Sequence, residues 1–228
     1  MLSEKEHRIS DYLRTFVTEE RLRLFQNVLE QRTRYLTVVL ENIYQPQNAS
    51  AVLRSCDGFG IQDVHIIENF NDFTVSSGVT KGVDKWMTLE HYNKSDFNTV
   101  ECLNHLKGQG YAIAATSPHA EGYELHNMPL DKPVAIMFGA EKKGLTDTAL
   151  EMADMHVRIP MVGFSESFNI SVSAAVTLYD LAQRLKEQFP ASRKLSQNEQ
   201  DVLLLKWLRK SLENPELIEE RFTKENGL

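Results

Sequence analysis

Residues 134–145 read Val134-Ala-Ile-Met-Phe-Gly-Ala-Glu-Lys-Lys-Gly-Leu145, an unbroken apolar run followed by a loop in which two glycines flank an acid. Five apolar residues between a proline and a glycine have the length and composition of a buried β-strand. The glycines favour a tight turn that is open to a ligand, in which Glu141 can accept hydrogen bonds. From these residues alone, a plain strand-to-helix turn explains the loop equally well.

Four more runs of strand length lie on either side of this one, and helical stretches separate them. The strands are expected at residues 36–40, 64–67, 111–115 and 156–159, and the helices near 48–57, 96–108, 146–153 and 167–188. Near-continuous apolar strands that alternate with helices predict an α/β domain with a mostly parallel sheet and helices on both faces. We place this domain at residues 35–189.

Helical extensions are expected at both ends of the chain, over residues 1–34 and 190–228. Thr18 is a suitable N-cap for a helix in the first extension, because a hydroxyl can accept a hydrogen bond from an amide of the first turn. Apolar residues recur at helical spacing after Thr18. The second extension is predicted to hold a helix from Asn198 to about Leu212.

The composition is that of a globular protein, with 42% hydrophobic and 25% charged residues in 228. Residues 35–183 hold nine basic and eighteen acidic residues, whereas each end carries one net positive charge. The two ends of the chain could therefore bind a polyanion. Exposed helices that carry Lys and Arg only for solubility would give the same charge distribution. A charged N-terminus, two distant cysteines and short apolar runs favour a cytoplasmic protein and do not favour a membrane protein.

Three common kinds of site are not favoured by the sequence. The 139–146 loop has the glycine spacing of a phosphate-binding P-loop, but Leu145 stands where that loop requires its lysine. Gly58-Phe-Gly60 begins like a dinucleotide fingerprint, but Asp63 takes the place of the third glycine. The histidines do not follow a metal-ligand spacing such as HxH or HExxH, so we expect no metal site.

Two further polar clusters follow apolar runs. The first is Asn48-Ala-Ser-Ala-Val-Leu-Arg54, which could be an N-cap asparagine and a surface arginine. The second runs from Ile159-Pro-Met161 through a glycine loop to Ser167-Phe-Asn169-Ile-Ser171. Its serines and asparagine could be helix caps, but they are more small polar groups than one helix start requires.

In order and spacing, the three clusters closely resemble the motifs of the SpoU/TrmH family of SPOUT RNA methyltransferases. Those motifs read N-x-x-A-x-x-R, F-G-x-E-x-x-G, and I-P-M-x-G followed by S-x-N-x-S. The resemblance covers about residues 35–185. It implies a homodimer with a deep trefoil knot over about residues 134–185, and S-adenosylmethionine as the cofactor. The flanking helices are similar to those of members that methylate the 2′-hydroxyl of guanosine 18 in the tRNA D-loop, which is the reaction we expect.

The resemblance also implies roles for individual residues. The expected catalytic residues are Arg54, Asn48, Glu141, Ser167 and Asn169. The expected cofactor-binding residues are Thr116, Phe138, Gly139, Ile159, Met161 and Phe168. The expected tRNA-binding residues are Arg8, Arg14, Arg21, Arg23, Arg32, Arg34, Lys206, Arg209 and Lys210. Because a guanidinium stays charged in proteins, we expect Arg54 to bind the phosphate beside the target ribose and to stabilise the developing alkoxide, with the proton leaving late or to water.

Two other functions fit the same motifs. One is 2′-O-methylation of another tRNA nucleotide or of ribosomal RNA. Members that act on ribosomal RNA commonly carry an additional N-terminal RNA-binding domain, and the 34 residues before the first strand are too few for one. The other is a non-catalytic protein that binds S-adenosylmethionine or RNA, which would be expected to have lost Arg54 or Asn169.

Overall fold

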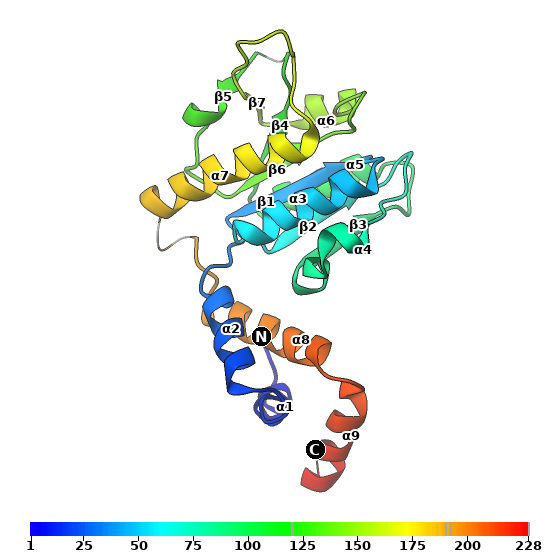
Figure 1. Cartoon of the computed structure of the whole chain (residues 1–228), viewed down its shortest axis with the longest axis vertical. Helices are drawn as coiled ribbons and strands as arrows, with labels where there is room; N and C mark the ends of the chain where they lie inside the picture. The colour runs from blue at the N-terminus through cyan, green and yellow to red at the C-terminus, as the bar shows by residue number, and fades with distance from the viewer. Residues whose placement is uncertain (120, 190, 192, 228) are drawn as a thin grey trace. The chain divides into compact units, whose positions relative to one another are not determined.

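The computed structural model describes residues 1–119, 121–189, 191 and 193–227 (Figure 1). It divides into two compact units: an α/β unit, Thr33–Arg193, and a helical unit made of Met1–Arg32 together with Lys194–Leu228. The extensions expected at the two ends of the chain therefore fold together. Pro190, where the second extension was expected to begin, lies outside the described residues.

The α/β unit is built on a seven-stranded sheet in the order β3-β2-β1-β6-β4-β7-β5, and every neighbouring pair in it is parallel. The strands are β1 Leu36–Glu41, β2 Asp63–Ile67, β3 Thr88–Tyr92, β4 Ala112–Thr116, β5 Tyr123–Glu124, β6 Val134–Phe138 and β7 Met155–Arg158. β1 and β6 lie inside the sheet. Parallel strands end at the same edge, so the loops after β1, β4, β6 and β7 meet there.

Side chains alternate between two cores along the inner strands, as the period of two in a strand requires. Leu36, Val38 and Leu40 face a core shared with α3 (Pro46–Gly58) and α7 (Ile170–Gln188). Val39 faces the opposite core, which is shared with α5 (Asn98–Gly108) and α6 (Asp147–Met152). Figure 1 shows α3 and α7 on the near face of the sheet, with α5 and α6 behind it. The predicted α/β class, with a parallel sheet and helices on both faces, is confirmed; the trefoil knot stays a prediction.

The predicted strands and helices occur with ends that differ from the prediction by at most three residues, and the strand at 134–138 matches at both ends. This unit also contains α4 Ser77–Thr80 and the 3₁₀ turns η1 Val83–Trp86 and η2 Leu125–Asn127. The sequence prediction missed β3 and β5. β3 is an edge strand that carries Glu90 and His91 and is only half-buried, so it lacks a continuous apolar run.

The helical unit contains α1 Glu4–Arg14, α2 Glu19–Leu29, α8 Gln197–Ser211 and α9 Pro215–Asn226. Thr18 is the N-cap of α2, as predicted, and its side chain accepts a hydrogen bond from the amide of Arg21 at 3.2 Å. Leu13, Phe25, Trp207 and Leu208 are buried and give the unit its own small core. Within the described ranges, no helix is long and apolar enough to cross a bilayer.

Candidate active site

A cleft of about 790 Å³ opens at the carboxyl ends of β4 and β6. Its lining includes Thr116 after β4, Phe138 and Glu141 from β6 and its loop, and Phe168 just before α7. A smaller pocket of about 80 Å³ adjoins it, with Thr116, Ser167 and Phe168 in both linings. Clefts at this edge of a parallel sheet are the usual ligand sites of such folds.

The loop after β6 is closed on itself. The amide of Ala140 donates to the carbonyl of Gly144 at 3.0 Å, and the amide of Gly144 donates back at 2.8 Å. A Cβ on Gly139 would lie 2.1 Å from the carbonyl carbon of Gly144, and Gly144 itself has a φ of +70°. Both glycines are therefore required by the turn, and the turn presents Glu141 to the cleft.

Hydrogen bonds join the three sequence clusters into one chain. Nδ2 of Asn48 donates to Oε1 of Glu141 at 3.0 Å. Nδ2 of Asn169 donates to Oδ1 of Asn48 at 3.3 Å. Oδ1 of Asn169 accepts from the amide and hydroxyl of Ser171 at 2.9 and 2.6 Å. One residue of each cluster thus orients a residue of the next.

Glu141 is held as a carboxylate by its partners. Burial raises the pKa of this carboxyl, but the hydrogen bonds donated by Asn48 and by the backbone amides of Gln45 and Tyr44 outweigh burial. The net effect is a pKa below the ordinary value. The Gln45 amide lies 3.3 Å from Oε1 and the Tyr44 amide 3.5 Å from Oε2, so Glu141 also fixes the backbone between β1 and α3.

The two asparagines differ in how they relate to their helices. Asn48 lies in the first turn of α3, whose N-cap is Gln45 with Pro46 following, so the N-cap interpretation of Asn48 is wrong. Asn169 is the N-cap of α7. Its carbonyl oxygen caps the helix while its amide nitrogen binds Asn48, and so it has a structural and a positioning role at once.

The structure brings the expected cofactor-binding residues to these two adjoining cavities. Thr116 and Phe168 line both cavities, Phe138 and Gly139 line the larger, and Ile159 and Met161 line the smaller. The Thr116 hydroxyl donates to the carbonyl of Met137 at 2.6 Å. The smaller cavity has a mainly apolar lining, whereas the larger one is lined mostly by polar and charged residues. Together the apolar side chains and the polar groups beside them fit the adenosine part of S-adenosylmethionine, a flat heteroaromatic ring that carries a polar sugar.

Among the expected catalytic residues, Glu141, Ser167 and Asn169 line the larger cavity. Asn48 does not line it and is joined to it through its hydrogen bonds with Glu141 and Asn169. Arg54 is not brought to the cleft at all. It lies six residues beyond Asn48 on α3, about 9 Å along the helix axis and on a different side of the helix. Its side chain is exposed, and it makes no hydrogen bond or ion pair with any residue that the structure describes. Ser167, in contrast, lines both cavities.

The expected tRNA-binding residues fall into three groups. Arg8, Arg21, Arg23 and Lys210 are exposed, and Arg14 and Lys206 are half-buried. Arg34 and Arg209 are half-buried and bound to carboxylates, Arg34 to Asp63 at 2.7 Å and Arg209 to Glu219 at 2.7 and 2.9 Å. Arg32 is only 1% exposed, and its guanidinium lies over the Trp207 ring at 5.7 Å. Arg32 is therefore a core residue of the helical unit, and its assignment to an RNA-binding surface is corrected.

Sequence reasoning missed two features of this site. Lys142 and Lys143 line the large cleft and are exposed, and they are its nearest cations to Glu141 in the sequence. The backbone amides of Tyr44 and Gln45 bind Glu141, which no side-chain pattern could indicate. The two lysines lie in the loop after Phe138, so the sequence could have indicated them as candidate ligand-binding residues. The described part of the chain contains no group of three His, Cys, Asp or Glu residues that could hold a metal ion.

Comparison with known proteins identifies the family. The model of the SpoU rRNA Methylase family matches residues 35–179. The tRNA (guanosine(18)-2′-O)-methyltransferase of Borreliella burgdorferi is 40% identical over 207 residues, which cover 91% of this chain and 93% of that protein. The protein of the same name from Thermus thermophilus is 36% identical over 194 residues, covering 85% and 98%.

A solved structure is similar over nearly the same length. The crystal structure of the Aquifex aeolicus TrmH/SpoU tRNA modifying enzyme matches with a TM-score of 0.77 and 29% identity, covering 86% of this chain and 98% of that one. The region that the family model matches, residues 35–179, runs from just before β1 well into α7 and contains all three sequence clusters. On sequence and structure together, the chain belongs to the SpoU family of RNA methyltransferases.

Proposed function

We propose that this protein is a cytoplasmic tRNA methyltransferase that transfers a methyl group from S-adenosylmethionine to the 2′-hydroxyl of guanosine 18 in the D-loop. The observation that carries the proposal is the hydrogen-bonded chain of Asn169, Asn48 and Glu141 at the cleft. Near-full-length relatives from Borreliella burgdorferi and Thermus thermophilus bear the name of this activity.

The two adjoining cavities would hold S-adenosylmethionine, which supplies an electrophilic methyl group when bound. Phe138 and Phe168 would pack on its adenosine part, with Ile159 and Met161 beside them. The remaining work of the protein is to bring a ribose hydroxyl to this site and to stabilise the charge that develops on it.

Glu141 acts as a positioning residue in this scheme. Its lowered pKa makes it a weak proton acceptor near neutral pH, and its oxygens already accept hydrogen bonds from Asn48 and two backbone amides. It holds the backbone between β1 and α3 and the Asn48 amide in a fixed orientation. The substrate ribose then meets a rigid set of polar groups, which lowers the cost of alignment.

Arg54 is assigned to the RNA phosphate. An exposed guanidinium that is not committed to a protein carboxylate can form paired hydrogen bonds with a phosphate. A phosphate held at Arg54 would draw the neighbouring ribose towards Asn48 along α3, and the positive charge would stabilise the developing alkoxide. Lys142 and Lys143, at the rim of the cleft, supply further positive charge for the RNA backbone.

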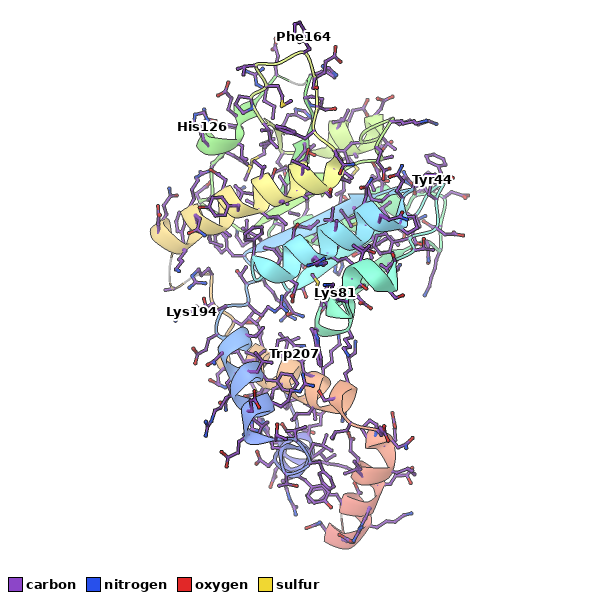
Figure 2. All side chains as sticks on the ribbon, in the orientation of Figure 1. Tyr44, Lys81, His126, Phe164, Lys194 and Trp207 are labelled. Carbon is purple, nitrogen blue, oxygen red and sulfur yellow. The ribbon has the colours of Figure 1, made fainter. Side chains whose placement is uncertain are left out.

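We propose that the active protein is a homodimer. Val172, Val176 and Tyr179 follow one another at helical spacing on α7 and are 39–58% exposed, which leaves an apolar stripe on that helix. The Phe59 ring meets Tyr179 at 6.0 Å and extends the stripe. Phe164, in the loop before α7, is fully exposed and points away from the unit (Figure 2). A second copy would cover this apolar surface.

Sedimentation equilibrium tests the dimer. Wild type should have twice the chain mass, and Tyr179→Glu should have the monomer mass because a charge cannot be buried in an apolar contact. Tyr123→Ala, at an edge strand, is the matched control and should remain dimeric. A monomeric wild type, or a Tyr179→Glu protein that still dimerises, would contradict the proposal.

Methyl transfer to tRNA transcripts tests the function. With labelled S-adenosylmethionine, wild type should place the label on the ribose of guanosine 18, and a transcript with adenosine at position 18 should accept none. Arg54→Ala should lose transfer but still bind S-adenosylmethionine, since Arg54 lies outside the cleft. A label on another tRNA nucleotide, or on ribosomal RNA alone, would replace the proposed substrate and leave the reaction type standing.

A further inference from the structure

Three aromatic side chains stand exposed at the edge of the sheet that carries the active-site cleft. Tyr44 follows β1, Phe70 follows β2 and Phe97 follows β3, and their exposures are 71%, 79% and 68%. Loops of this kind are usually polar, and exposed aromatic side chains that gather in one place mark a binding surface. We call these three residues the aromatic row.

The members of the aromatic row share two clefts. Tyr44 and Phe70 line a cleft of about 740 Å³. Phe70 and Phe97 line a second cleft of about 310 Å³. Phe70 belongs to both and therefore stands between the other two. Figure 2 shows the Tyr44 ring projecting from the α/β unit into open space.

Buried asparagines hold the backbone of this surface in place. Asn42 has a φ of +56°, and its Oδ1 accepts hydrogen bonds from the amides of Asn69 at 2.8 Å and Phe70 at 3.0 Å. The main-chain carbonyl oxygen of Asn42 accepts a hydrogen bond from Nδ2 of Asn71 at 2.9 Å. The loop that presents Phe70 is thus fastened to the end of β1, although its ring is not covered.

Hydrogen bonds to side chains also hold the backbone at the other two aromatic residues, Phe97 and Tyr44. The amide of Phe97 donates to Oγ of Ser95 at 3.0 Å, and the amide of Ser95 donates to Oδ1 of the buried Asn98 at 3.1 Å. The amide of Tyr44 donates to Glu141 at 3.5 Å. The last contact makes the aromatic row continuous with the active site, since Glu141 also binds Asn48.

Charge restricts what could bind here. The ionisable side chains that line the two clefts besides Tyr44 are Asp72 in the first and Asp96 in the second, and no Lys or Arg is among the described lining residues. Negative charge disfavours a phosphate at this surface. A flat, neutral ring with N–H groups at its edge is favoured, because aromatic faces stack on it and the Asp72 carboxylate can accept its hydrogen bonds.

We propose that Tyr44, Phe70 and Phe97 form a stacking platform for unpaired bases of the RNA substrate on either side of the target ribose. The inference rests on the proposed RNA methylation and deepens it. A ribose inside a folded RNA reaches the cleft only when its neighbours leave their own stack, and aromatic side chains replace the stacking that these bases lose. Arg54, Lys142 and Lys143 take the phosphates, whereas the aromatic row takes the bases.

Binding of tRNA transcripts without S-adenosylmethionine tests the platform. Phe70→Ala should raise the Kd for tRNA about tenfold or more, and Phe70→Trp should restore it, because indole stacks at least as well as phenyl. The Kd for S-adenosylmethionine should stay unchanged in both variants. Tyr123 is an exposed aromatic residue on β5, which lies at the other end of the strand order from β3. Tyr123→Ala is therefore the matched control and should bind tRNA like wild type.

A fluorescent base reports stacking directly. With 2-aminopurine next to position 18 in the D-loop, wild type should quench the fluorescence on binding, and Phe70→Ala should abolish the quenching. Unchanged tRNA affinity and unchanged quenching in Phe70→Ala would overturn the platform. So would a fall in oligomer mass of Phe70→Ala without RNA, since the row would then be a contact between copies of the chain. Failure of guanosine 18 methylation in wild type, with the Phe70 effects on binding intact, would reject the proposed function and retain the platform.

Discussion

Arg54 and Glu141 show how two charged residues of one site can do different work. Glu141 accepts hydrogen bonds from Asn48 and from two backbone amides, so it is committed to the protein. Arg54 is exposed and is not committed to any residue that the structure describes. The first residue therefore shapes the site, and the second is available to the substrate.

The pH dependence of Arg54 variants separates charge stabilisation from base catalysis. We expect Arg54→Ala to lower kcat/KM for tRNA by about 100-fold or more, the usual loss for a group that stabilises transition-state charge. Arg54→Lys should recover part of the rate because it retains the charge. Its pH-rate profile should keep the wild-type shape. An ionisation that moves with the Lys substitution would identify Arg54 as the base and contradict our assignment.

Glu141 also predicts a pH dependence of stability. Its pKa is lower in the folded protein than the ordinary value of 4.5, so the carboxylate stabilises the fold above about pH 4.5. This contribution is lost as the pH falls through the folded pKa. We expect the free energy of unfolding in urea to fall more steeply for wild type than for Glu141→Gln below pH 4.5. Parallel curves in that window would show that the hydrogen bonds of Glu141 do not stabilise the carboxylate.

At the scale of elements, helix α7 offers a way to separate capping from positioning. Asn169→Asp keeps an oxygen that caps α7 but removes the Nδ2 donor to Asn48. We expect it to retain stability and lose activity. Asn169→Ala should lose activity and in addition about 1 kcal/mol of stability, the usual cost of a lost N-cap. Thermal unfolding and kcat/KM, measured on both variants, give the comparison; equal activity of Asn169→Asp and wild type would contradict a role for the donor.

A buried acid at the end of β1 supports a second prediction about elements. Glu41 is fully buried and accepts hydrogen bonds from the Thr99 hydroxyl and from the amide and hydroxyl of Thr146, at 2.7–2.9 Å. It ties β1 to the N-cap of α6 and to α5. We expect Glu41→Leu to destabilise the protein by about 1–3 kcal/mol, because the buried Thr99 hydroxyl and the two part-buried donors of Thr146 lose their acceptor. Denaturant unfolding with Thr37→Val, another buried polar residue of β1, as a comparison would measure this; a stability equal to wild type would contradict it.

The elements that sequence predicted best are those whose patterns are strictly local. The strand at 134–138 is apolar throughout, and Thr18 precedes an amphipathic helix. α1 was missed although Ser3 and Glu6 form a capping box that is readable in the sequence. β3 was missed because an edge strand needs no continuous apolar run.

Within the site, too, local sequence patterns were predicted and tertiary contacts were not. The order of the three clusters predicted which residues lie near the cleft, because parallel strands end at one edge. Contacts between clusters, such as Asn169 with Asn48, depend on tertiary packing and left no signal in the sequence. Arg32 was misassigned for that reason: its partner Trp207 lies at the other end of the chain.

At the scale of the whole molecule, net charge does not explain how the protein could bind a polyanion such as RNA. Residues 1–32 and 194–228, the helical unit, hold twelve basic and thirteen acidic residues, and residues 33–193 hold thirteen and nineteen. Neither unit is a net cation. A polyanion must therefore be bound by particular exposed guanidinium and ammonium groups, and by contacts with bases that require no positive charge.

The salt dependence of tRNA binding tests this view of the whole molecule. Each phosphate that a basic side chain neutralises releases counterions, so the Kd should rise steeply with salt. Arg21→Gln and Arg8→Gln, both exposed, should each make the slope of log Kd against log salt about one unit shallower. Arg209→Gln should change the slope less, because Glu219 already neutralises its charge. A slope that none of these substitutions changes would place the RNA on other residues.

We propose above all that the three sequence clusters act as one active site through their hydrogen bonds. A double-mutant cycle on kcat/KM for tRNA, with Asn48→Ala, Glu141→Ala and the double variant, tests it most directly. We predict that the double variant loses little more activity than the more damaging single variant, because both changes break the same chain of contacts. Losses that multiply would show that Asn48 and Glu141 act independently, and would contradict the claim.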